Sequence, residues 1–286
     1  MEEKNKVLGS TLYLVGTPIG NLADISERAK KVLAEVDFIA AEDTRTSMRL
    51  LSALGIRSEL ISYHEHNRRA SGERIVARLL AGESCALITD AGMPAISDPG
   101  EDIVRECAEA GIVVSVVPGA CAAVSALALS GLPTARFAFE GFLPVQKGER
   151  GKRLAAVAKD TRTMIFYEAP HKLRGTLADM AEVFGGERKI SLCREMTKLN
   201  EEVERLTLAE AIAGYGQKEP RGEYVLVIEG YAGESVDEEC EALSSLSPEE
   251  HIAHYEAQGL GRMDAMKRAA KDRGMTKSEL YKLVNG

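Results

Sequence analysis

The sequence predicts an α/β protein made of two α/β domains and a small helical C-terminal extension. Short continuous apolar runs alternate with amphipathic stretches up to about Ser130, and the same alternation restarts between residues 132 and 136. An acidic stretch then precedes a segment whose apolar residues have helical spacing. Alternating strand and helix patterns are typical of sheets covered by helices. We therefore expect domains at residues 1–125 and 126–233, a linker at 234–247 and a helical extension at 248–286.

Five apolar runs in the first domain predict a parallel sheet that is buried on both faces, because such strands read as continuous hydrophobic segments. The runs are LYLVG, DFIAAED, ELISYH, CALITD and VVSVVPG. The amphipathic stretches predict helices on both faces of this sheet, at residues 25–36, 47–54, 73–81, 101–110 and 120–130.

Four further apolar runs predict the strands of a second, smaller α/β domain. They are FAFEGF, TMIFYEA, KISLCREM and YVLVIEG. Helical spacing predicts two helices between them, at residues 154–159 and 173–184.

The balance of charge reverses along the C-terminal part. Residues 234–250 hold seven acidic and no basic side chains, which is typical of a solvated linker. Residues 262–286 hold seven Lys or Arg against three acidic residues, and their spacing predicts a helix, a turn at Gly274 and a second helix capped at Thr276 or Ser278. This segment is either a helical appendage of the core or a module that contacts RNA.

The whole chain carries 36 basic and 44 acidic residues, a net charge of −8. This balance excludes a protein that coats nucleic acid non-specifically, because such binding depends on neutralising phosphates with Lys and Arg. Any RNA contact therefore needs local basic patches. No run of about 18 apolar residues suggests a membrane span, so we expect a cytoplasmic protein.

The cysteines are odd in number, widely spaced and free of any CxxC pair, which argues against both disulfides and a zinc site. We expect reduced and mostly buried thiols at Cys85, Cys107, Cys121, Cys193 and Cys240.

Three turns that follow predicted strands carry the candidate chemistry, because ligands of open parallel sheets bind beyond the carboxyl ends of the strands. The first turn, GTPIGN from Gly16, allows close approach of backbone to a ligand, although a tight turn alone also explains it. It lacks the GxGxxG pattern of a dinucleotide site, which disfavours an NAD-dependent dehydrogenase, and the Lys of a P-loop. The third, VPGACA around Pro118, opens a helix with small residues, which close packing also explains. We expect the turns from Gly16, Asp90 and Pro118 to converge in one crevice.

The second turn, DAGMPAISDPG from Asp90, is longer than a connection to the next helix requires. A structural alternative is a connector in which Ser97 or Asp98 caps the following helix. That alternative leaves Asp90 and the Met93–Pro94 pair unexplained, so the length of the turn favours a functional loop.

The motifs LVGTPIGNLADIS, AEDTRTS, ITDAGMPAISDPG and VPGACAAVSAL resemble, in order, those of the tetrapyrrole-methylase superfamily, and the resemblance extends over residues 11–232. It implies a homodimer that holds S-adenosylmethionine in a folded shape between two α/β domains. Many relatives have Ser or Thr where Cys121 stands, so a hydroxyl contact to the cofactor is replaced here. The residues that the resemblance assigns to the cofactor site are Pro18, Asp90, Gly92, Pro94, Ile96, Ala120, Cys121, Tyr167 and Gly222.

Four shorter motifs, AEDTRT, SYHEHN, FLP and YEAPH, resemble the branch of the superfamily that methylates a ribose 2'-hydroxyl in small-subunit ribosomal RNA. The resemblance implies a decoding-centre cytidine of 16S ribosomal RNA as the target. A tetrapyrrole methyltransferase with the same cofactor cleft is the alternative, and a non-catalytic RNA-binding protein is another.

Polar residues after the second and third strands are placed where they would hold phosphate and ribose. The loop at residues 146–153 is predicted to be a mobile basic segment suited to gripping RNA, or an ordinary solvated loop. A metal site at His64-Glu65-His66 is disfavoured, because no third ligand accompanies it and neighbouring strand residues point to opposite faces. The RNA-binding candidates are Arg45, His66, Asn67, Arg68, Lys147, Arg150, Lys152 and Arg153, with Arg69 beside them.

Methyl transfer from an activated sulfonium depends mainly on alignment, because positioning supplies effective molarities on the order of 10⁵–10⁸ M and a general base adds about 10²–10⁴-fold. Helix capping or salt bridging explains each candidate carboxylate at least as easily as a catalytic role. The candidates for accepting the hydroxyl proton or orienting the ribose are Glu42, Asp43, His64 and Asp98.

Overall fold

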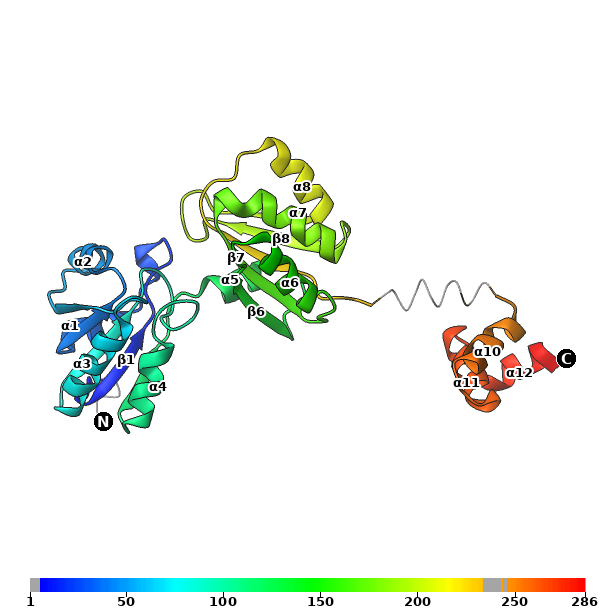
Figure 1. Cartoon of the computed structure of the whole chain (residues 1–286), viewed down its shortest axis with the longest axis horizontal. Helices are drawn as coiled ribbons and strands as arrows, with labels where there is room; N and C mark the ends of the chain where they lie inside the picture. Colours follow the sequence, from blue (N-terminus) through cyan, green and yellow to red (C-terminus); the bar gives the residue numbers. More distant parts are fainter. Residues whose placement is uncertain (1–5, 234–242, 244–245, 286) are drawn as a thin grey trace. The chain divides into compact units, whose positions relative to one another are not determined.

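The computed structural model describes residues 6–233, 243 and 246–285, and Figure 1 traces the chain. It divides into two compact units. The first comprises residues 1–158 and 162–229, and the second comprises 159–161 and 230–286. No helix in the described ranges is long and apolar enough to cross a membrane.

The first sheet confirms the predicted parallel arrangement, with strand order β3-β2-β4-β1-β5 and every pair parallel. Its strands are β1 (Thr11–Val15), β2 (Phe38–Ala41), β3 (Glu59–Ser62), β4 (Ser84–Ile88) and β5 (Val113–Val117). Alternate residues of each inner strand enter different cores: Leu12 and Leu87 belong to one, and Tyr13 and Ile88 to the other. Burial on both faces explains the unbroken apolar runs.

Helices follow each strand of the first sheet (Figure 1). They are α1 (Glu27–Glu35), α2 (Thr44–Ala53), α3 (Arg68–Leu80), α4 (Glu101–Glu109) and α5 (Ala122–Ser130), with a 3-10 turn η1 (Leu22–Asp24). Two helices begin earlier than predicted. The side chain of Asp43 accepts the backbone N–H of Arg45 and starts α2, and α3 starts after Asn67, ahead of its first buried apolar side chain, Ile75.

Helix α5 packs against the second sheet and not the first. Ala123, Ala126 and Leu127 share a core with Ile165 and Val225 of that sheet. The predicted domain boundary at residue 125 therefore lies inside a helix, and clustering of contacts keeps both sheets in one unit.

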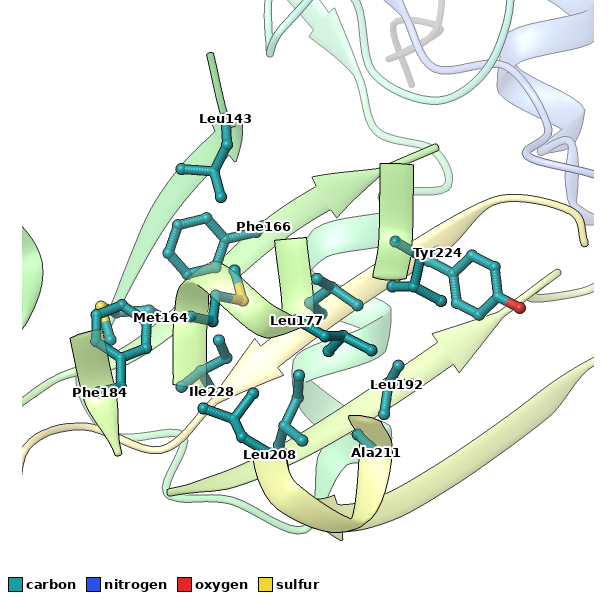
Figure 2. Packing of buried hydrophobic residues seen from close by; sticks show 14 of the residues in the cluster. Leu143, Met164, Phe166, Leu177, Phe184, Leu192, Leu208, Ala211, Tyr224 and Ile228 are labelled. Atoms are coloured by element: carbon teal, nitrogen blue, oxygen red, sulfur yellow. The ribbon is translucent and has the colours of Figure 1, made fainter. Parts of the chain in front are cut away.

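The second sheet has the order β6-β7-β10-β8-β9, with β6 parallel to β7 and the other pairs antiparallel. Figure 2 shows part of the core on its other face, where α7 and α8 pack over the strands. The strands are β6 (Phe137–Phe142), β7 (Thr163–Glu168), β8 (Lys189–Arg194), β9 (Glu202–Thr207) and β10 (Tyr224–Ile228). The helices are α6 (Lys147–Val157), η2 (Pro170–Lys172), α7 (Leu173–Phe184) and α8 (Leu208–Gln217).

The prediction of a mobile basic loop at residues 146–153 is wrong. Helix α6 covers this stretch, Leu154 is fully buried, and the Nε of Arg150 donates to Asp179 of α7 over 2.6 Å. Gly148 and Gly151 suggested a loop, but a buried leucine and an ion pair to the neighbouring helix hold the segment helical.

The second unit contains α10 (Pro248–Ala257), α11 (Arg262–Asp272) and α12 (Lys277–Asn285). The predicted turn is confirmed, because Gly274 has φ +63°, and the hydroxyl of Thr276 accepts the N–H of Glu279 over 3.3 Å. Of the predicted linker at 234–247, residues 234–242 and 244–245, with Cys240, lie outside the described residues. The four described cysteines are free thiols, and three of them are buried.

Candidate cofactor cleft and active site

A cavity of about 610 Å³ in the first unit is lined by residues that follow β1, β2, β4 and β5, together with residues on or after β6, β7, β8 and β10. Its volume is typical of a site for a small ligand or cofactor. A cavity therefore lies at the predicted position, beyond the carboxyl ends of the parallel strands.

The three turns converge, as predicted. Thr17 and Gly92 exchange backbone hydrogen bonds of 2.9 and 3.2 Å, which join the first turn to the second. A Cβ at Gly16 would lie 2.7 Å from the Cα of Gly119, so the first and third turns meet backbone to backbone. No side chain larger than hydrogen fits at this contact.

The long turn after β4 has an unusual backbone. Ala95 and Ser97 lie in the left-handed region, with φ of +66° and +59°, a strained conformation that tends to occur at functional sites. Gly100 caps α4 with φ +145°, so the alternative in which Ser97 or Asp98 caps this helix is wrong. Both side chains instead line the cavity.

One wall of the cavity carries three carboxylates, Glu42, Asp90 and Asp98. Burial, reinforced by the nearby charge of Glu42, raises the pKa of Asp98 to about 6, and the same two causes raise the pKa of Asp90. Thr89 donates its hydroxyl to Glu42 over 2.8 Å. Among the described residues none of the three carboxylates forms an ion pair, so this acidic wall favours a positively charged ligand.

Another wall of the cavity is largely apolar and belongs to the second sheet. Its side chains include Tyr167, Cys193, Met196 and Val225. The Tyr167 ring makes edge contacts with Phe139 and Phe142 at centroid distances of 5.1 and 5.4 Å. Its hydroxyl accepts the N–H of Ala123 over 3.2 Å, and burial raises the pKa of Tyr167 to about 12. This apolar wall is suited to a flat, uncharged ring.

The sequence patterns did not predict a third group of lining residues, which lie after β8 and before β10. Lys198 pairs with Glu195 over 2.9 Å and with Glu223 over 2.8 Å, and all three line the cavity. Glu195 has φ +50°, and Gly222 next to it leaves room for its side chain. Ligand sites are expected beyond the carboxyl ends of parallel strands. Because β8 is antiparallel to both of its neighbours, this expectation does not extend to the residues that follow it.

The predicted cofactor residues fall into two groups. Those that line the cavity are Asp90, Gly92, Ile96, Cys121 and Tyr167. The others each adjoin a lining residue in the chain without lining the cavity themselves, and they are Pro18, Pro94, Ala120 and Gly222.

The four catalytic candidates also separate. Glu42 and Asp98 line the cavity, whereas Asp43 and His64 do not. Asp43 caps α2 and binds the side chain of Arg45, and these hydrogen bonds lower the pKa of Asp43 to about 2. The buried Nδ1 of His64 has no hydrogen-bond partner among the described residues.

The predicted RNA-binding residues after β3 lie together around an open depression of about 410 Å³, which is lined by His66, Asn67, Arg68 and Arg69 among others. The side chain of Asn67 is occupied locally, because its oxygen accepts the His64 N–H over 2.8 Å. Arg68 pairs with Asp102 over 3.0 Å.

The remaining RNA-binding candidates all form ion pairs within the protein. Arg45 is bound to Asp43, and Arg150 and Lys147 face Asp179. Lys152 pairs with Glu149 over 2.8 Å, and Arg153 pairs with Glu140 over 2.6 Å.

One of the two arguments against a metal site at His64-Glu65-His66, strand alternation, does not apply, because His64 and His66 follow β3 and their rings make an edge contact at 5.9 Å. Within residues 6–233, 243 and 246–285, no group of three or more His, Cys, Asp or Glu side chains is arranged to hold a metal ion.

Similarity to known protein families identifies the family of the chain that forms this cavity. Residues 11–212 match the family model of the tetrapyrrole (corrin/porphyrin) methylases. The chain belongs to the tetrapyrrole methylase family. It is accordingly a methyltransferase whose donor is S-adenosylmethionine.

Curated relatives named ribosomal RNA small subunit methyltransferase I match most of the chain. The protein from Halalkalibacterium halodurans is 48% identical over 96% of this chain and 94% of its own length. The protein from Escherichia coli O157:H7 is 44% identical over 95% of this chain and 93% of its own length.

Solved structures agree in fold. Uroporphyrin-III-C-methyltransferase from Thermus thermophilus has a TM-score of 0.55 at 23% identity, with 77% of this chain and 94% of that chain covered. Diphthine synthase has a TM-score of 0.58 at 12% identity, with 77% and 89% covered.

The walls fit the chemistry of this donor. S-adenosylmethionine combines a sulfonium cation with an adenine ring, and the cavity lining offers both carboxylates that form no ion pair among the described residues and an apolar surface. Asp90 and Asp98 would face the cationic part, and Tyr167, Met196 and Val225 would hold the ring.

Proposed function

We propose that the protein transfers a methyl group from S-adenosylmethionine to the ribose 2'-hydroxyl of a cytidine in 16S ribosomal RNA, at decoding-centre position 1402. The observation that carries this proposal is the position of Asp98 in the cleft, a partly buried carboxylate beside Glu42 with its pKa raised to about 6. The names of the curated relatives, which cover nearly the whole chain, support ribosomal RNA as the substrate.

When bound, the donor supplies a methyl group on a positively charged sulfur, which is already activated for transfer. The protein's part is to hold the 2'-oxygen in line with that methyl group, to exclude water and to accept the hydroxyl proton. The strained turn from Asp90 to Gly100 and the contact between Gly16 and Gly119 fix the geometry of the cleft before ligands enter.

Asp98 is the proton acceptor in this proposal. A carboxylate of ordinary pKa is a weak base at neutral pH, and the shift to about 6 makes Asp98 a stronger one that remains largely ionised at pH 7. Glu42 acts as a positioning residue, because its charge contributes to the raised pKa of Asp98 and its own carboxylate is held by Thr89.

The RNA would approach from the side of β2 and β3. Arg45 is largely exposed, with 87% of its side chain accessible, and its guanidinium pairs with Asp43, a contact that it can exchange for a phosphate. His66, Arg68 and Arg69 surround the neighbouring open depression, where further phosphates would bind. Asp43 then serves as the cap of α2 that orients Arg45.

A homodimer is part of the proposal. Helix α5, AAVSALALS, has no charged residue, and while one side packs on the second sheet, Val124, Ala128 and Leu129 are exposed on the other. Val113 and Val116 of edge strand β5 are exposed as well. A helix that is apolar all round is normally buried, so a second copy of this chain is the occupant we propose for this surface. We also propose that the dimer is cytoplasmic, where its substrate is assembled.

The test uses a radiolabelled methyl donor with isolated small subunits, free 16S ribosomal RNA and a porphyrinoid as separate substrates. After nuclease digestion, we expect the label in 2'-O-methylcytidine from one position. Label on the porphyrinoid alone, on a base, or on no substrate would contradict the proposal. Arg45→Ala is expected to lower methylation of RNA while leaving affinity for the donor unchanged.

A further inference from the structure

The second unit has an apolar core of its own. Helices α10, α11 and α12 bury eight hydrophobic residues together, from Leu243 through Ile252 and Ala265 to Leu280. The described residues that line the cleft all belong to the first unit, and the second unit has a surface of its own.

Within this unit, the segment that forms α11 and α12 differs in charge from α10, which holds three glutamates and no Lys or Arg. From residue 262 to the end there are seven Lys or Arg and three acidic residues, whereas the whole chain has 36 basic against 44 acidic. A basic segment in an acidic protein is an electrostatic signature of contact with nucleic acid.

Most of the described carboxylates of this unit are already engaged. Glu279 accepts the N–H of Thr276 over 2.7 Å, Asp272 accepts the hydroxyl of Tyr255 over 2.6 Å, and Glu256 pairs with Arg262. These contacts serve caps and helix packing. They leave few negative charges to neutralise the lysines.

Lys267, Lys271 and Lys282 are exposed and form no ion pair within the described ranges. Lys267 and Lys271 are one turn apart on α11, opposite the buried Ala265 and Ala269. Most lysines of the first unit behave differently, as Lys30 and Lys189 do in pairing with a glutamate. Lysines left without partners on one small unit are available for phosphates.

The arrangement of α11 and α12 is compatible with this use. The two helices are joined by a tight turn at Gly274, and the side chain of Tyr281 on α12 is 56% exposed beside Lys282. Exposed aromatic rings next to cations stack on unpaired bases while the cations contact the backbone.

We propose that the three-helix unit is an RNA-binding module in which Lys267, Lys271 and Lys282 contact phosphates of the ribosomal RNA substrate. This rests on the proposed function for the identity of the RNA. Because phosphate contacts carry no sequence information, the module supplies affinity and the cleft selects the nucleotide.

The experiment compares the full chain with the variant K267Q/K271Q/K282Q in binding a labelled 16S ribosomal RNA transcript at several salt concentrations. Each lost phosphate contact removes about 0.7–0.9 from the slope of log affinity against log salt, so we expect the slope to fall by about 2–3 and the affinity to fall about tenfold or more. The matched control, K30Q/K31Q/K189Q, removes three lysines that pair with glutamates and should bind as the unaltered protein does. Affinity for S-adenosylmethionine, measured on all three proteins, reports whether the first unit is intact.

Equal affinity and salt slope in the lysine variant and the unaltered protein would overturn the inference. So would a loss of binding to assembled small subunits without a loss for free RNA, because that result points to a protein partner. The readout is binding and not methylation, so a chain that binds RNA through these lysines but methylates none would refute the proposed function and leave this inference standing.

Discussion

The acidic wall of the cleft and the apolar wall around Tyr167 differ in charge and in polarity. The first sheet contributes the carboxylates of Glu42, Asp90 and Asp98, which form no ion pair among the described residues. Glu42 and Asp98 are partly buried, and Asp90 is exposed. The second sheet contributes an apolar surface that includes Tyr167 and Met196, and beside it the charged group of Lys198, whose charge is paired with Glu195 and Glu223. The donor is itself divided into a cation and a flat ring, so the contrast suggests that each sheet recognises one half of it.

The contrast follows from strand direction. All five strands of the first sheet end at the same edge, where loops with polar side chains collect. In the second sheet, antiparallel neighbours bring strand interiors such as Cys193 and Val225 to the cleft, and strand interiors are apolar. Variants of the two walls should therefore affect different steps.

The largest effect is expected for Asp98→Asn. The amide cannot accept the hydroxyl proton, so kcat should fall by about 10²–10⁴-fold, the usual contribution of a general base. Asp24→Asn, which alters an exposed carboxylate outside the cleft, serves as the control. Single-turnover methylation of RNA measures the effect, and an unchanged rate would remove Asp98 from the mechanism.

The next largest effect is expected at the contact between Gly16 and Gly119, where the first and third turns meet. Gly16→Ala places a methyl group 2.7 Å from the Cα of Gly119, and overpacking of this kind costs about 1–3 kcal/mol. We expect affinity for S-adenosylmethionine, measured by calorimetry, to fall about ten- to hundredfold. Gly148→Ala, at an open helical position, is the matched control. Equal affinities in both variants would show that the turns do not need this contact.

The pH dependence of the methylation rate tests whether the charge of Glu42 raises the pKa of Asp98. Asp98 must be ionised to act, so the rate should fall as pH drops through about 6. Glu42→Gln removes a negative charge that raises the pKa of Asp98, and the acidic limb of the profile should therefore move to lower pH. A limb that stays in place, or moves to higher pH, would contradict the coupling.

The smallest effect is expected on the apolar wall. Tyr167→Phe keeps the ring but removes the hydroxyl that accepts the Ala123 N–H, a contact worth about 0.5–1.5 kcal/mol. We expect KM for the donor to rise about two- to tenfold, with the pH profile unchanged. A shifted pH profile would mean that the two walls do not act separately.

Sequence predicted the first sheet well because its strands are buried on both faces and read as unbroken apolar runs. It missed β9, whose residues Glu202, Glu204 and Arg205 are charged and lie on an edge strand, and the helix α8 that follows. It also interpreted the first part of α6, up to Arg153, as a loop, since the partner of Arg150 is Asp179, 29 residues away. Such pairs are invisible to local patterns.

Only the part of the candidate site that follows parallel strands was predicted from the sequence. Asp90 and Asp98 follow such a strand and were singled out, whereas Glu195 and Lys198 follow an antiparallel one and were not. Asp43 and Asp98 looked alike in the sequence. The structure distinguishes them, because one caps a helix and the other faces the cleft.

The most direct test of the division between the walls compares two ligands that differ in charge at sulfur. Calorimetry would measure binding of S-adenosylmethionine and of neutral S-adenosylhomocysteine to the unaltered protein and to Asp90→Asn. A unit charge close to a carboxylate near the protein surface is stabilised by about 1–2 kcal/mol, so affinity for the cation should fall about tenfold and affinity for the neutral ligand should change less than about twofold. Equal losses for both ligands, or no loss for the cation, would contradict the account.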